Sequence, residues 1–332
     1  MITETSPILS LLFAKGLGTR TLSDLVNRLV EDDLSFADLV QLAPDDLVRD
    51  FGLRPSVAEN IHAAHEQAER VAEELEKHSV QILVRGVEPY PRKLFQVLAG
   101  DAPPVLFARG CLSLLGRKAV GLCGARNASE KGIRVARDSA RLLAPDDVNV
   151  VSGYAKGVDL AAHRAALEAG GVTTIVLAEG ILHFRPKREV KDLLDENNYL
   201  VISEFSPRLP WAARNAMQRN KTICGLSDAL IVIESGMKGG TFAAAESSLK
   251  LKRPLFVAEY AQPAESAAGN QYFIERGATA LRGDRSGRPN LARVYEALGI
   301  ANGREPSDST TKEAESDVGH EGQGVSNSNG VK

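Results

Sequence analysis

From residue 118 onward, short runs rich in Val, Ile and Leu alternate with helical stretches, and this alternation constrains the fold more than any other feature of the chain. It is the pattern of strand–helix–strand units, whose strands pair in parallel between two layers of helices. We therefore predict an α/β fold with a doubly wound, mostly parallel sheet. The predicted strands are 118–123, 148–153, 173–180, 199–205, 229–235, 254–260 and a short 277–281. The predicted helices between them are 129–144, 159–170, 187–198, 214–227 and 240–252.

The segments that flank this block differ from it. Residues 1–80 show helical periodicity, with a Gly16-Leu17-Gly18 turn that resembles half of a helix-hairpin-helix (SAM-like) module. Residues 81–117 are rich in proline and predict an extended connector clamped against the sheet. Residues 301–332 lack aromatic side chains and cannot form a core. We predict a small all-helical domain over 1–80, an α/β domain over 81–300 and a disordered polar tail over 301–332.

The net charge of −3 hides an uneven distribution along the chain. Residues 1–80 hold 7 Lys and Arg against 15 Asp and Glu, and residues 301–332 hold 3 against 6. Residues 81–300 hold 30 against 22, which leaves this block at +8. An excess of basic residues favours an anionic partner, of which nucleic acid is one candidate. The acidic surroundings of the helices in 1–80 argue against a phosphate contact there.

Composition excludes several other classes of protein. No apolar run reaches the roughly 20 residues of a membrane-spanning helix, and no basic segment precedes the short apolar stretch near residue 10. We therefore expect a cytoplasmic protein without membrane contact. Cys111, Cys123 and Cys224 are too widely spaced for a disulfide framework or a zinc site, so we expect buried thiols, no metal and no cofactor.

Ligands of an open parallel sheet bind beyond the carboxyl ends of its strands, so the turns that follow the strands are the candidate site. After the first predicted strand, Gly124 permits a tight turn and Ser129 is a good N-cap for the next helix. Arg126 lies between them, and all three are candidate phosphate-binding residues. A guanidinium beside the free N–H groups of a helix N-terminus suits bidentate contact with a phosphate.

A second turn of small residues follows the strand at 148–153. Its candidate phosphate-binding residues are Ser152, Gly153, Lys156 and Gly157. The glycines let a ligand approach the backbone, and the lysine adds charge at the rim. Asp159 and His163 lie in the following helix, where a carboxylate stabilises the first turn and a lone histidine is more often structural than catalytic. We assign neither a catalytic role.

Two further stretches carry groups that suit phosphate. A glycine turn with a hydroxyl opens the helix after the strand at 229–235, and it consists of Gly239, Gly240 and Thr241. Residues 213–221 pack three cations and several amides into nine residues. From this stretch we expect contacts to a nucleic-acid backbone from Arg219, Asn220 and Lys221.

Together, and in this order, the motifs resemble the DNA-processing protein A family, also called Smf. The resemblance covers roughly residues 80–283. It rests on Tyr90-Pro91, on Pro103-Pro104, on Gly124-Ala125-Arg126, and most of all on an unbroken SGxAxGxDxxAHxxAL signature at 152–167. The segments 203–205 and 219–234 also align.

The resemblance implies an extended Rossmann-like domain, often homodimeric, that binds and protects single-stranded DNA. It further implies help in loading a RecA-type recombinase during recombination or natural transformation, by binding and without catalysis. The family holds DNA with the arginine that matches Arg126 and with a Phe-Pro-Arg-Arg-Asn-Arg segment that matches 216–221. Here Met217 and Gln218 replace Pro and Arg, so one cation is missing. Many members carry a winged-helix domain where this sequence has its polar tail.

A small-nucleotide sensor is the alternative function. The same superfamily includes nucleotide-binding proteins and phosphoribohydrolases with a PGGxGTxxE turn, which Gly239-Gly240-Thr241 and Glu246 loosely resemble. The spacing to the glutamate differs and the proline is absent, so a hydrolase is the weaker form of this alternative. Single-stranded DNA needs a continuous basic track and surfaces for base stacking. The aromatic residues near the motifs are Tyr154, Phe205 and Trp211.

Overall fold

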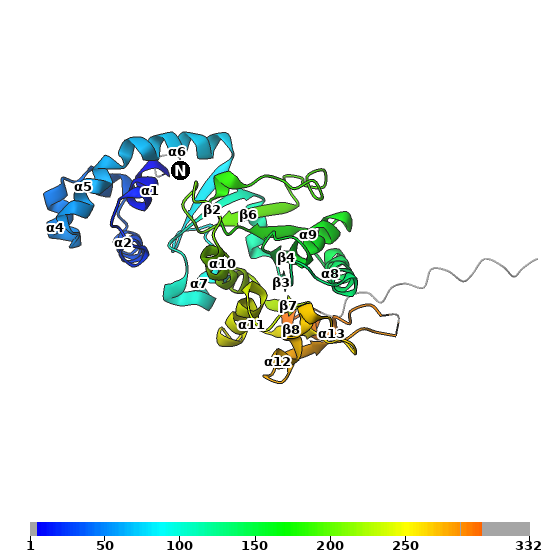
Figure 1. The fold of residues 1–332 in the computed structure, drawn as a ribbon. Coiled ribbons are helices and arrows are strands. Elements are labelled where there is room, and N and C mark those ends of the chain that lie inside the picture. The colour runs from blue at the N-terminus through cyan, green and yellow to red at the C-terminus, as the bar shows by residue number, and fades with distance from the viewer. Residues whose placement is uncertain (1–4, 286, 301–332) are drawn as a thin grey trace, which may run out of the picture.

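The computed structural model describes residues 5–285 and 287–300 and has the α/β architecture predicted from the sequence (Figure 1). Nine strands of the described chain form one sheet in the order β1-β2-β6-β5-β4-β3-β7-β8-β9. They are β1 (Val80–Val84), β2 (Val105–Gly110), β3 (Ala119–Cys123), β4 (Asn149–Ser152), β5 (Thr173–Val176), β6 (Tyr199–Ser203), β7 (Ala229–Val232), β8 (Leu255–Ala258) and β9 (Thr279–Leu281). The strands from β3 to β9 pair in parallel, whereas β1 and β2 extend the sheet antiparallel beyond β6.

Helices cover both faces of the sheet, which makes it doubly wound. One face carries α8 (Glu130–Leu143), α9 (Val158–Glu168) and α13 (Ala292–Leu298). The other face carries α7 (Arg92–Leu98), α10 (Ala213–Leu226), α11 (Gly240–Lys250) and α12 (Asn270–Ile274). β3 and β7 contribute buried side chains to both layers, for example Val120 and Ile231 to one and Cys123 and Val232 to the other. This two-sided burial explains why the strands are continuous apolar runs without polar alternation.

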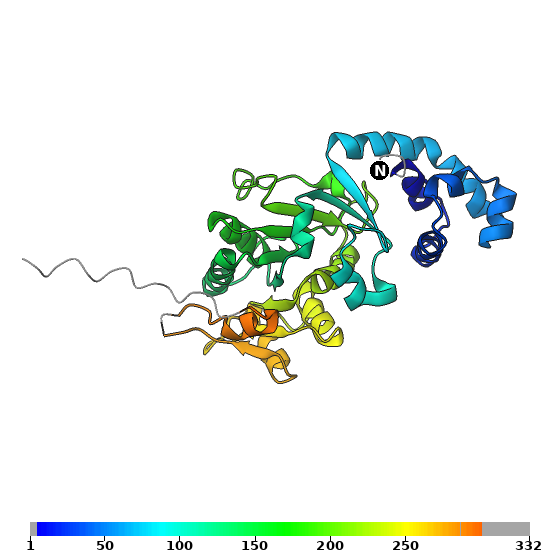
Figure 2. The same cartoon turned by 180° about the vertical axis from the view of Figure 1, so that it is seen from behind.

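Six helices precede the sheet and lie to one side of it, with α6 leading into β1 (Figure 1 and Figure 2). They are α1 (Thr5–Phe13), α2 (Thr19–Glu31), α3 (Phe36–Gln41), α4 (Pro44–Phe51), α5 (Pro55–Ala63) and α6 (His65–Lys77). Their apolar core is continuous with Val84 of β1 and Phe107 of β2. The buried guanidinium of Arg85 also ties α2 to the sheet, because it donates to Ser23 Oγ, to Asn27 Oδ1 and to the carbonyl of Ala102.

Two expectations about secondary structure need correction. The stretch 81–117 contains the antiparallel strands β1 and β2 and the helix α7, so it is part of the sheet and more than a connector. The stretch 187–198 forms turns instead of the predicted helix. Its backbone is held by other partners: the N–H of Lys187 donates to the Tyr154 hydroxyl, and the N–H of Asp195 donates to the side chain of Asn198. The predicted tail at 301–332 lies outside the described residues.

The expectation of buried thiols is confirmed for Cys123 and Cys224, whereas Cys111 is partly exposed. Within residues 5–285 and 287–300, no helix combines the length and the apolar character that crossing a bilayer requires.

Candidate functional site

The candidate site lies where the sheet changes direction. From β3 the chain proceeds through β4, β5 and β6 on one side, and then returns to place β7 against the other side of β3. In doubly wound sheets, the loops beyond the carboxyl ends of strands at such a switch point form the ligand crevice. The turns predicted to bind phosphate follow β3, β4 and β7, so the topology brings all three to this edge of the sheet.

Glycines allow the first two turns to touch. Gly157 has a φ of 81°, and a Cβ there would lie 2.4 Å from the carbonyl oxygen of Ala125 and 2.5 Å from that of Arg126. A Cβ on Gly124 would in turn lie 2.4 Å from the side chain of Val158. No larger residue fits at either position without displacing the neighbouring turn. The backbone that carries Arg126 is therefore held against the start of α9.

Arg126 extends from this turn into solvent and meets an exposed aromatic ring. Its guanidinium carbon lies 5.4 Å from the ring centroid of Trp211, whose residue is 50% exposed. Trp211 comes from the loop between β6 and α10, which is fastened to the chain after β5 by a 2.8 Å hydrogen bond from Gly180 N–H to the carbonyl of Leu209. An exposed tryptophan beside an arginine is a surface on which a base can stack. Of the other two predicted aromatic residues, Tyr154 and Phe205 are buried.

Arg219 lies inside the protein, although it was expected at the surface. It is only 6% exposed, and its guanidinium packs on Gly153, where a Cβ would lie 1.5 Å from Nη1. Burial raises the pKa of Asp159, and the positive charge of Arg219 opposes that rise. Burial also lowers the pKa of Arg219 itself. Its Nε and Nη1 have no hydrogen-bond partner among the described residues. Because the guanidinium packs on Gly153, it supports the turn at 152–157 from beneath.

The neighbours of Arg219 on α10 also have partners within the protein. Asn220 is buried and donates from Nδ2 to the carbonyl of Gly240 at 2.8 Å, which joins α10 to the start of α11. Lys221 is exposed, and its Nζ lies 3.1 Å from Asp101 Oδ2. The sequence pattern predicted three surface contacts from this segment, but the structure leaves only Lys221 at the surface. A contact between these side chains and DNA stays a prediction.

The predicted residues that are exposed around the crevice are fewer than expected. They are Arg126, Lys156, Lys221, Gly239 and Gly240, with Thr241 partly exposed at the first turn of α11. The N-cap of α11 is Gly239, which provides no side-chain cap. The first N–H groups of this 11-residue helix are therefore uncapped by any side chain, and they suit an anion.

Ser129 does not have the freedom that its role as a phosphate ligand requires. Its hydroxyl donates to Glu234 Oε1 and accepts from the N–H of Gly132 at 3.0 Å, and its N–H donates to Glu234 Oε2 at 2.9 Å. Ser152 is likewise buried, with its hydroxyl donating to the carbonyl of Leu122. The structure therefore argues against a phosphate contact by the Ser129 hydroxyl. The contact expected from the backbone of Ser152 stays a prediction. The sequence analysis did not identify Glu234 as a site residue. An acidic residue at the end of the apolar run ALIVIES was the signal that could have identified it.

Asp159 and His163 stabilise the start of α9 from within. The N–H of Ala155 donates to Asp159 Oδ2 at 3.3 Å. His163 Nδ1 lies 2.6 Å from Thr173 Oγ1, and that hydroxyl donates to the carbonyl of Val150. Because the hydroxyl proton is used in this way, Nδ1 carries the proton of the imidazole. Burial, with help from Lys187 and Arg219, lowers the pKa of His163 to about 3.

Lys187 is a further cation at this edge that the motif analysis missed. It lies in the loop after β5, and its Nζ donates to the carbonyl of Tyr154 and lies 4.4 Å from the centroid of that ring. Burial lowers the pKa of Lys187. It stabilises Tyr154, which has a φ of 65° in the turn after β4. The signal in the sequence was the basic stretch that begins at Arg185.

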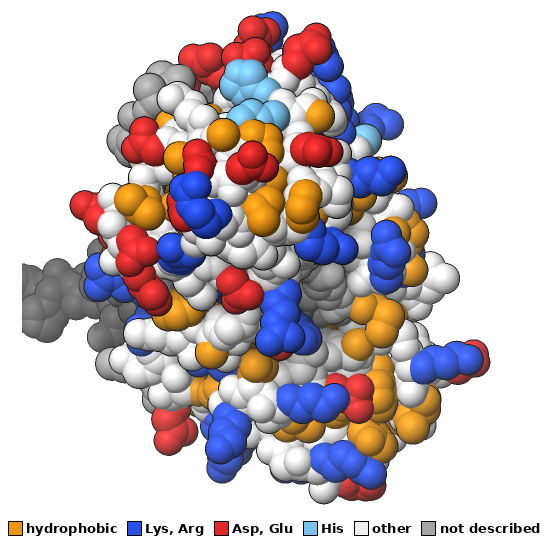
Figure 3. Space-filling view, turned by 90° about the vertical axis from the view of Figure 1, so that its left-hand side faces the viewer, with side chains coloured by type: hydrophobic (Ala, Val, Ile, Leu, Met, Phe, Trp, Pro, Cys, Tyr) orange, Lys and Arg blue, Asp and Glu red, His pale blue; other side chains and the backbone are white. Residues whose placement is uncertain are grey.

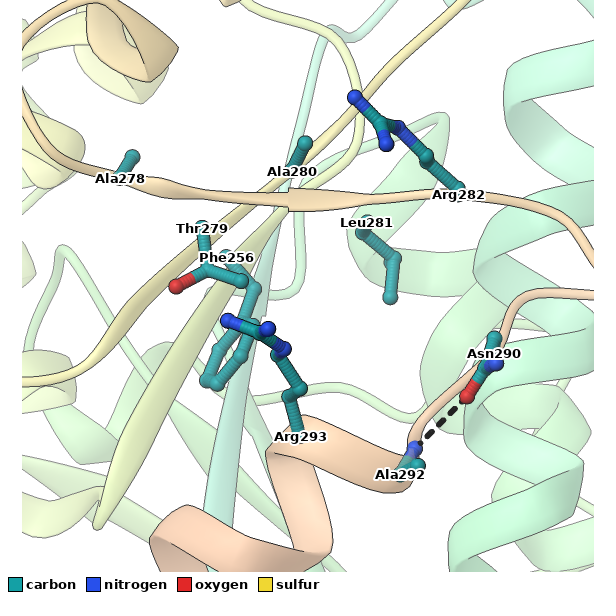
Figure 4. Close-up of a pocket in the computed structure, with 9 residues that line it drawn as sticks. All are labelled: Phe256, Ala278, Thr279, Ala280, Leu281, Arg282, Asn290, Ala292 and Arg293. Carbon is teal, nitrogen blue, oxygen red and sulfur yellow. Dashed lines mark hydrogen bonds between the residues drawn. The ribbon is translucent and has the colours of Figure 1, made fainter.

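A pocket at the far end of the sheet is separate from this crevice. It has a volume of about 590 Å³ and is lined by Phe256, β9, Asn290 and the first turn of α13 (Figure 4). Arg293 points from α13 toward Thr279, whereas Arg282 lies on the opposite side of β9 (Figure 4). This pocket lies at β8 and β9, the last two strands of the sheet, whereas the crevice lies beyond β3, β4 and β7. It shares no lining residue with the crevice.

The surface reflects the uneven charge of the sequence. Acidic side chains prevail over the upper part of one face, which the N-terminal helices form, and Lys and Arg prevail below them (Figure 3). The basic excess therefore belongs to the part of the molecule that contains the sheet and its crevice.

Comparison with known proteins agrees with the motifs. The model of the DNA recombination-mediator protein A family matches residues 81–286. Protein Smf of Escherichia coli is 32% identical over 207 residues, which cover 61% of this chain and 54% of the relative. DNA processing protein DprA of Streptococcus pneumoniae is 33% identical over 191 residues, which cover 57% and 66%. The chain thus spans between about half and two thirds of the length of these relatives.

Solved structures show the same fold. The crystal structure of DprA from Streptococcus pneumoniae superposes with a TM-score of 0.70 at 27% identity and covers 83% of this chain and 94% of that one. The structure of DNA processing protein A from Helicobacter pylori, described for its unique mode of binding single-stranded DNA, superposes with a TM-score of 0.54 at 24% identity. It covers 66% of this chain and 94% of that one, and it supports the fold alone. Because the family model matches more than half of the sequence, the chain belongs to the DNA recombination-mediator protein A (DprA/Smf) family.

Proposed function

We propose that this protein binds single-stranded DNA in the crevice beyond β3, β4 and β7 and acts by binding, without catalysis. One observation carries the proposal: Arg126 stands exposed on a turn held by Gly157, 5.4 Å from the exposed ring of Trp211. An arginine can bind a phosphate, and an aromatic ring beside it can stack on a base. A single strand can make both contacts, whereas the bases of a duplex are paired and cannot reach the ring.

The neighbouring residues extend this pair into a track. Lys156 lies on the turn after β4, and the uncapped start of α11 lies after β7, on the other side of β3. Successive phosphates can follow such a line across the edge of the sheet. Arg219 contributes through its buried charge and through its support of Gly153. Met217 and Met237 are each 55% exposed on the same group of loops and helices, and they offer apolar contact to bases.

The proposed biological setting is based on the family to which the chain belongs. We propose that the protein protects incoming DNA and assists a RecA-type recombinase in recombination or natural transformation, as a cytoplasmic homodimer. The basis for this part is family membership and the DNA processing named for its relatives. The recombinase and the dimer are tested by co-purification and by light scattering.

A competition experiment tests the central part of the proposal. A labelled single-stranded oligonucleotide is titrated with the protein, and its fluorescence anisotropy is followed while unlabelled single strand, duplex or AMP is added. We expect the single strand to compete best, the duplex weakly and AMP not at all. Displacement by AMP, or AMP binding in the absence of DNA binding, would instead identify a nucleotide sensor.

A further inference from the structure

Glu234 is a buried carboxylate at the point where a Rossmann-like fold usually binds phosphate. It follows β7 and is 1% exposed. It accepts hydrogen bonds from the N–H and the hydroxyl of Ser129, which is the N-cap of α8, and from the hydroxyl of Ser266 at 2.6 Å. Three donors from two loops therefore converge on one anion at the N-terminus of α8.

The sequence leaves room for this carboxylate. A Cβ on Gly132, in the first turn of α8, would lie 2.4 Å from Glu234 Oε1 and 2.6 Å from its carboxyl carbon. A glycine at 132 is thus needed for the helix to approach the acid so closely. In dinucleotide-binding folds, a glycine of the loop before this helix lets the backbone approach the pyrophosphate of the ligand. Here the space is filled by a group of the protein itself.

The partial charge at the N-terminus of α8 also favours Glu234 at this position. α8 is 14 residues long, and its N-terminus carries a partial positive charge that favours a negative group. Glu234 satisfies that preference from within the fold. A phosphate at the same place would meet a carboxylate of like charge and would find the donors of Ser129 already used.

The three helices that open onto the switch point therefore differ. α8 receives Glu234, and α9 carries Asp159 in its own first turn, whereas α11 has no acidic residue in its first turn. Two of these helix N-termini therefore have a carboxyl group of the protein beside them. Any phosphate is left with the side of the crevice formed by Arg126 and α11.

We propose that Glu234 is a specificity-determining residue: it substitutes for the phosphate of a nucleotide at α8 and excludes mononucleotides from the switch point. The proposal concerns a helix terminus next to the DNA track and does not require that DNA binds. It explains how a fold built like a nucleotide-binding domain can turn away free nucleotides.

Anion rescue of Glu234→Ala tests the proposal. The substitution removes the carboxylate and leaves a space lined by Ser129, Gly132 and Ser266. We expect the variant to melt at a lower temperature than wild type in chloride buffer, and to regain several degrees when phosphate or AMP replaces chloride at equal ionic strength. Wild type should gain less, because Glu234 already occupies the N-terminus of α8.

Glu234→Gln is the matched control, because glutamine fills the same space without the charge. It should be destabilised, and it should respond to phosphate no more than wild type does. Equal responses to phosphate in wild type and Glu234→Ala, or no response in Glu234→Ala, would overturn the proposal. If the alanine variant does not fold in either buffer, Glu234→Ser carries the same comparison, and calorimetric binding of AMP by wild type would also overturn it. AMP binding by wild type would count against both proposals, whereas the response of Glu234→Ala to phosphate involves no DNA and tests the role of Glu234 alone.

Discussion

Arg126 has the simplest role of any residue in the crevice, because its backbone is fixed by Gly157 while its side chain is exposed. Replacing it by alanine removes one charge-assisted contact and leaves the fold intact. We expect Arg126→Ala to weaken binding of single-stranded DNA by about 1 to 3 kcal/mol. Arg137→Ala is the control, since Arg137 is an exposed arginine further along α8. Unchanged affinity in a folded Arg126→Ala protein would remove Arg126 from the site.

His163 makes the stability of the fold depend on pH. Burial lowers its pKa from 6.5 to about 3, so between these values the unfolded chain binds a proton that the folded chain does not. The contribution of neutral His163 to the free energy of unfolding is therefore present above the pKa of histidine in the unfolded chain. It is lost as the pH falls toward the pKa of His163 in the folded protein. From pH 7 to pH 5 we expect a loss of about 2 kcal/mol in the free energy of unfolding, measured with urea. In His163→Asn this part of the dependence should vanish, and an equal dependence in both proteins would contradict the assignment.

At the scale of elements, the function depends on two turns that touch. Gly157→Ala would place a Cβ 2.4 Å from the Ala125 carbonyl at a φ of 81°, so the turn carrying Arg126 must move. We expect a loss of about 2 kcal/mol or more in stability together with weaker binding of DNA. Gly170→Ala is the control, since Gly170 has a φ of 73° and no atom within 4 Å of its Cβ position. It should cost about 1 kcal/mol and leave binding unchanged. If Gly157→Ala and Gly170→Ala bind single-stranded DNA equally well, the turn that contains Gly157 is not part of the DNA-binding site.

The elements that were predicted correctly are those whose signal is local. Every strand from β3 to β9 and four of the five helices between them follow from apolar runs, N-caps and glycine turns in the sequence. The helix predicted over 187–198 was wrong. The segment forms turns, with the N–H of Lys187 bonded to Tyr154, 33 positions earlier, and the N–H of Asp195 bonded to the side chain of Asn198. β1 and β2 were missed because their pairing crosses the helix α7 and is antiparallel, which the strand–helix rhythm does not indicate.

In the candidate site, too, the features that could be predicted are those with a local sequence signal. The glycine turns and the exposed position of Arg126 follow from motifs, because a turn is defined by its own residues. The burial of Arg219 and the use of Ser129 by Glu234 depend on α10 and β7 packing against turns more than 65 and 100 residues earlier in the chain. No pattern within either segment indicates those contacts.

At the scale of the whole molecule, Arg85 holds the N-terminal helices on the sheet. Its buried guanidinium donates to two side chains of α2 and to the carbonyl of Ala102. Arg85→Ala leaves these acceptors without a partner, and we expect it to lower the free energy of unfolding by about 1 to 3 kcal/mol. Arg208→Ala breaks the exposed pair with Glu74 across the same two parts and should cost less than about 1 kcal/mol. Chemical denaturation measures both, and equal losses would show that Arg85 has no special role.

The charge of the molecule is divided so that an acidic helical part stands beside a basic sheet (Figure 3). If the crevice is part of a track for single-stranded DNA, cationic groups of the protein must displace condensed cations from several phosphates when the strand binds. Each phosphate contact then contributes about −0.7 to the slope of log affinity against log salt concentration. A pocket for one nucleotide engages only one or two phosphates.

The most direct test is therefore the affinity for a labelled single-stranded oligonucleotide, measured by anisotropy at several salt concentrations. Three or more phosphate contacts predict a log–log slope of about −2 or steeper. Arg126→Ala should reduce the steepness by roughly one contact. A slope near zero, or binding too weak to measure at low salt, would contradict the account of this crevice as a track for single-stranded DNA.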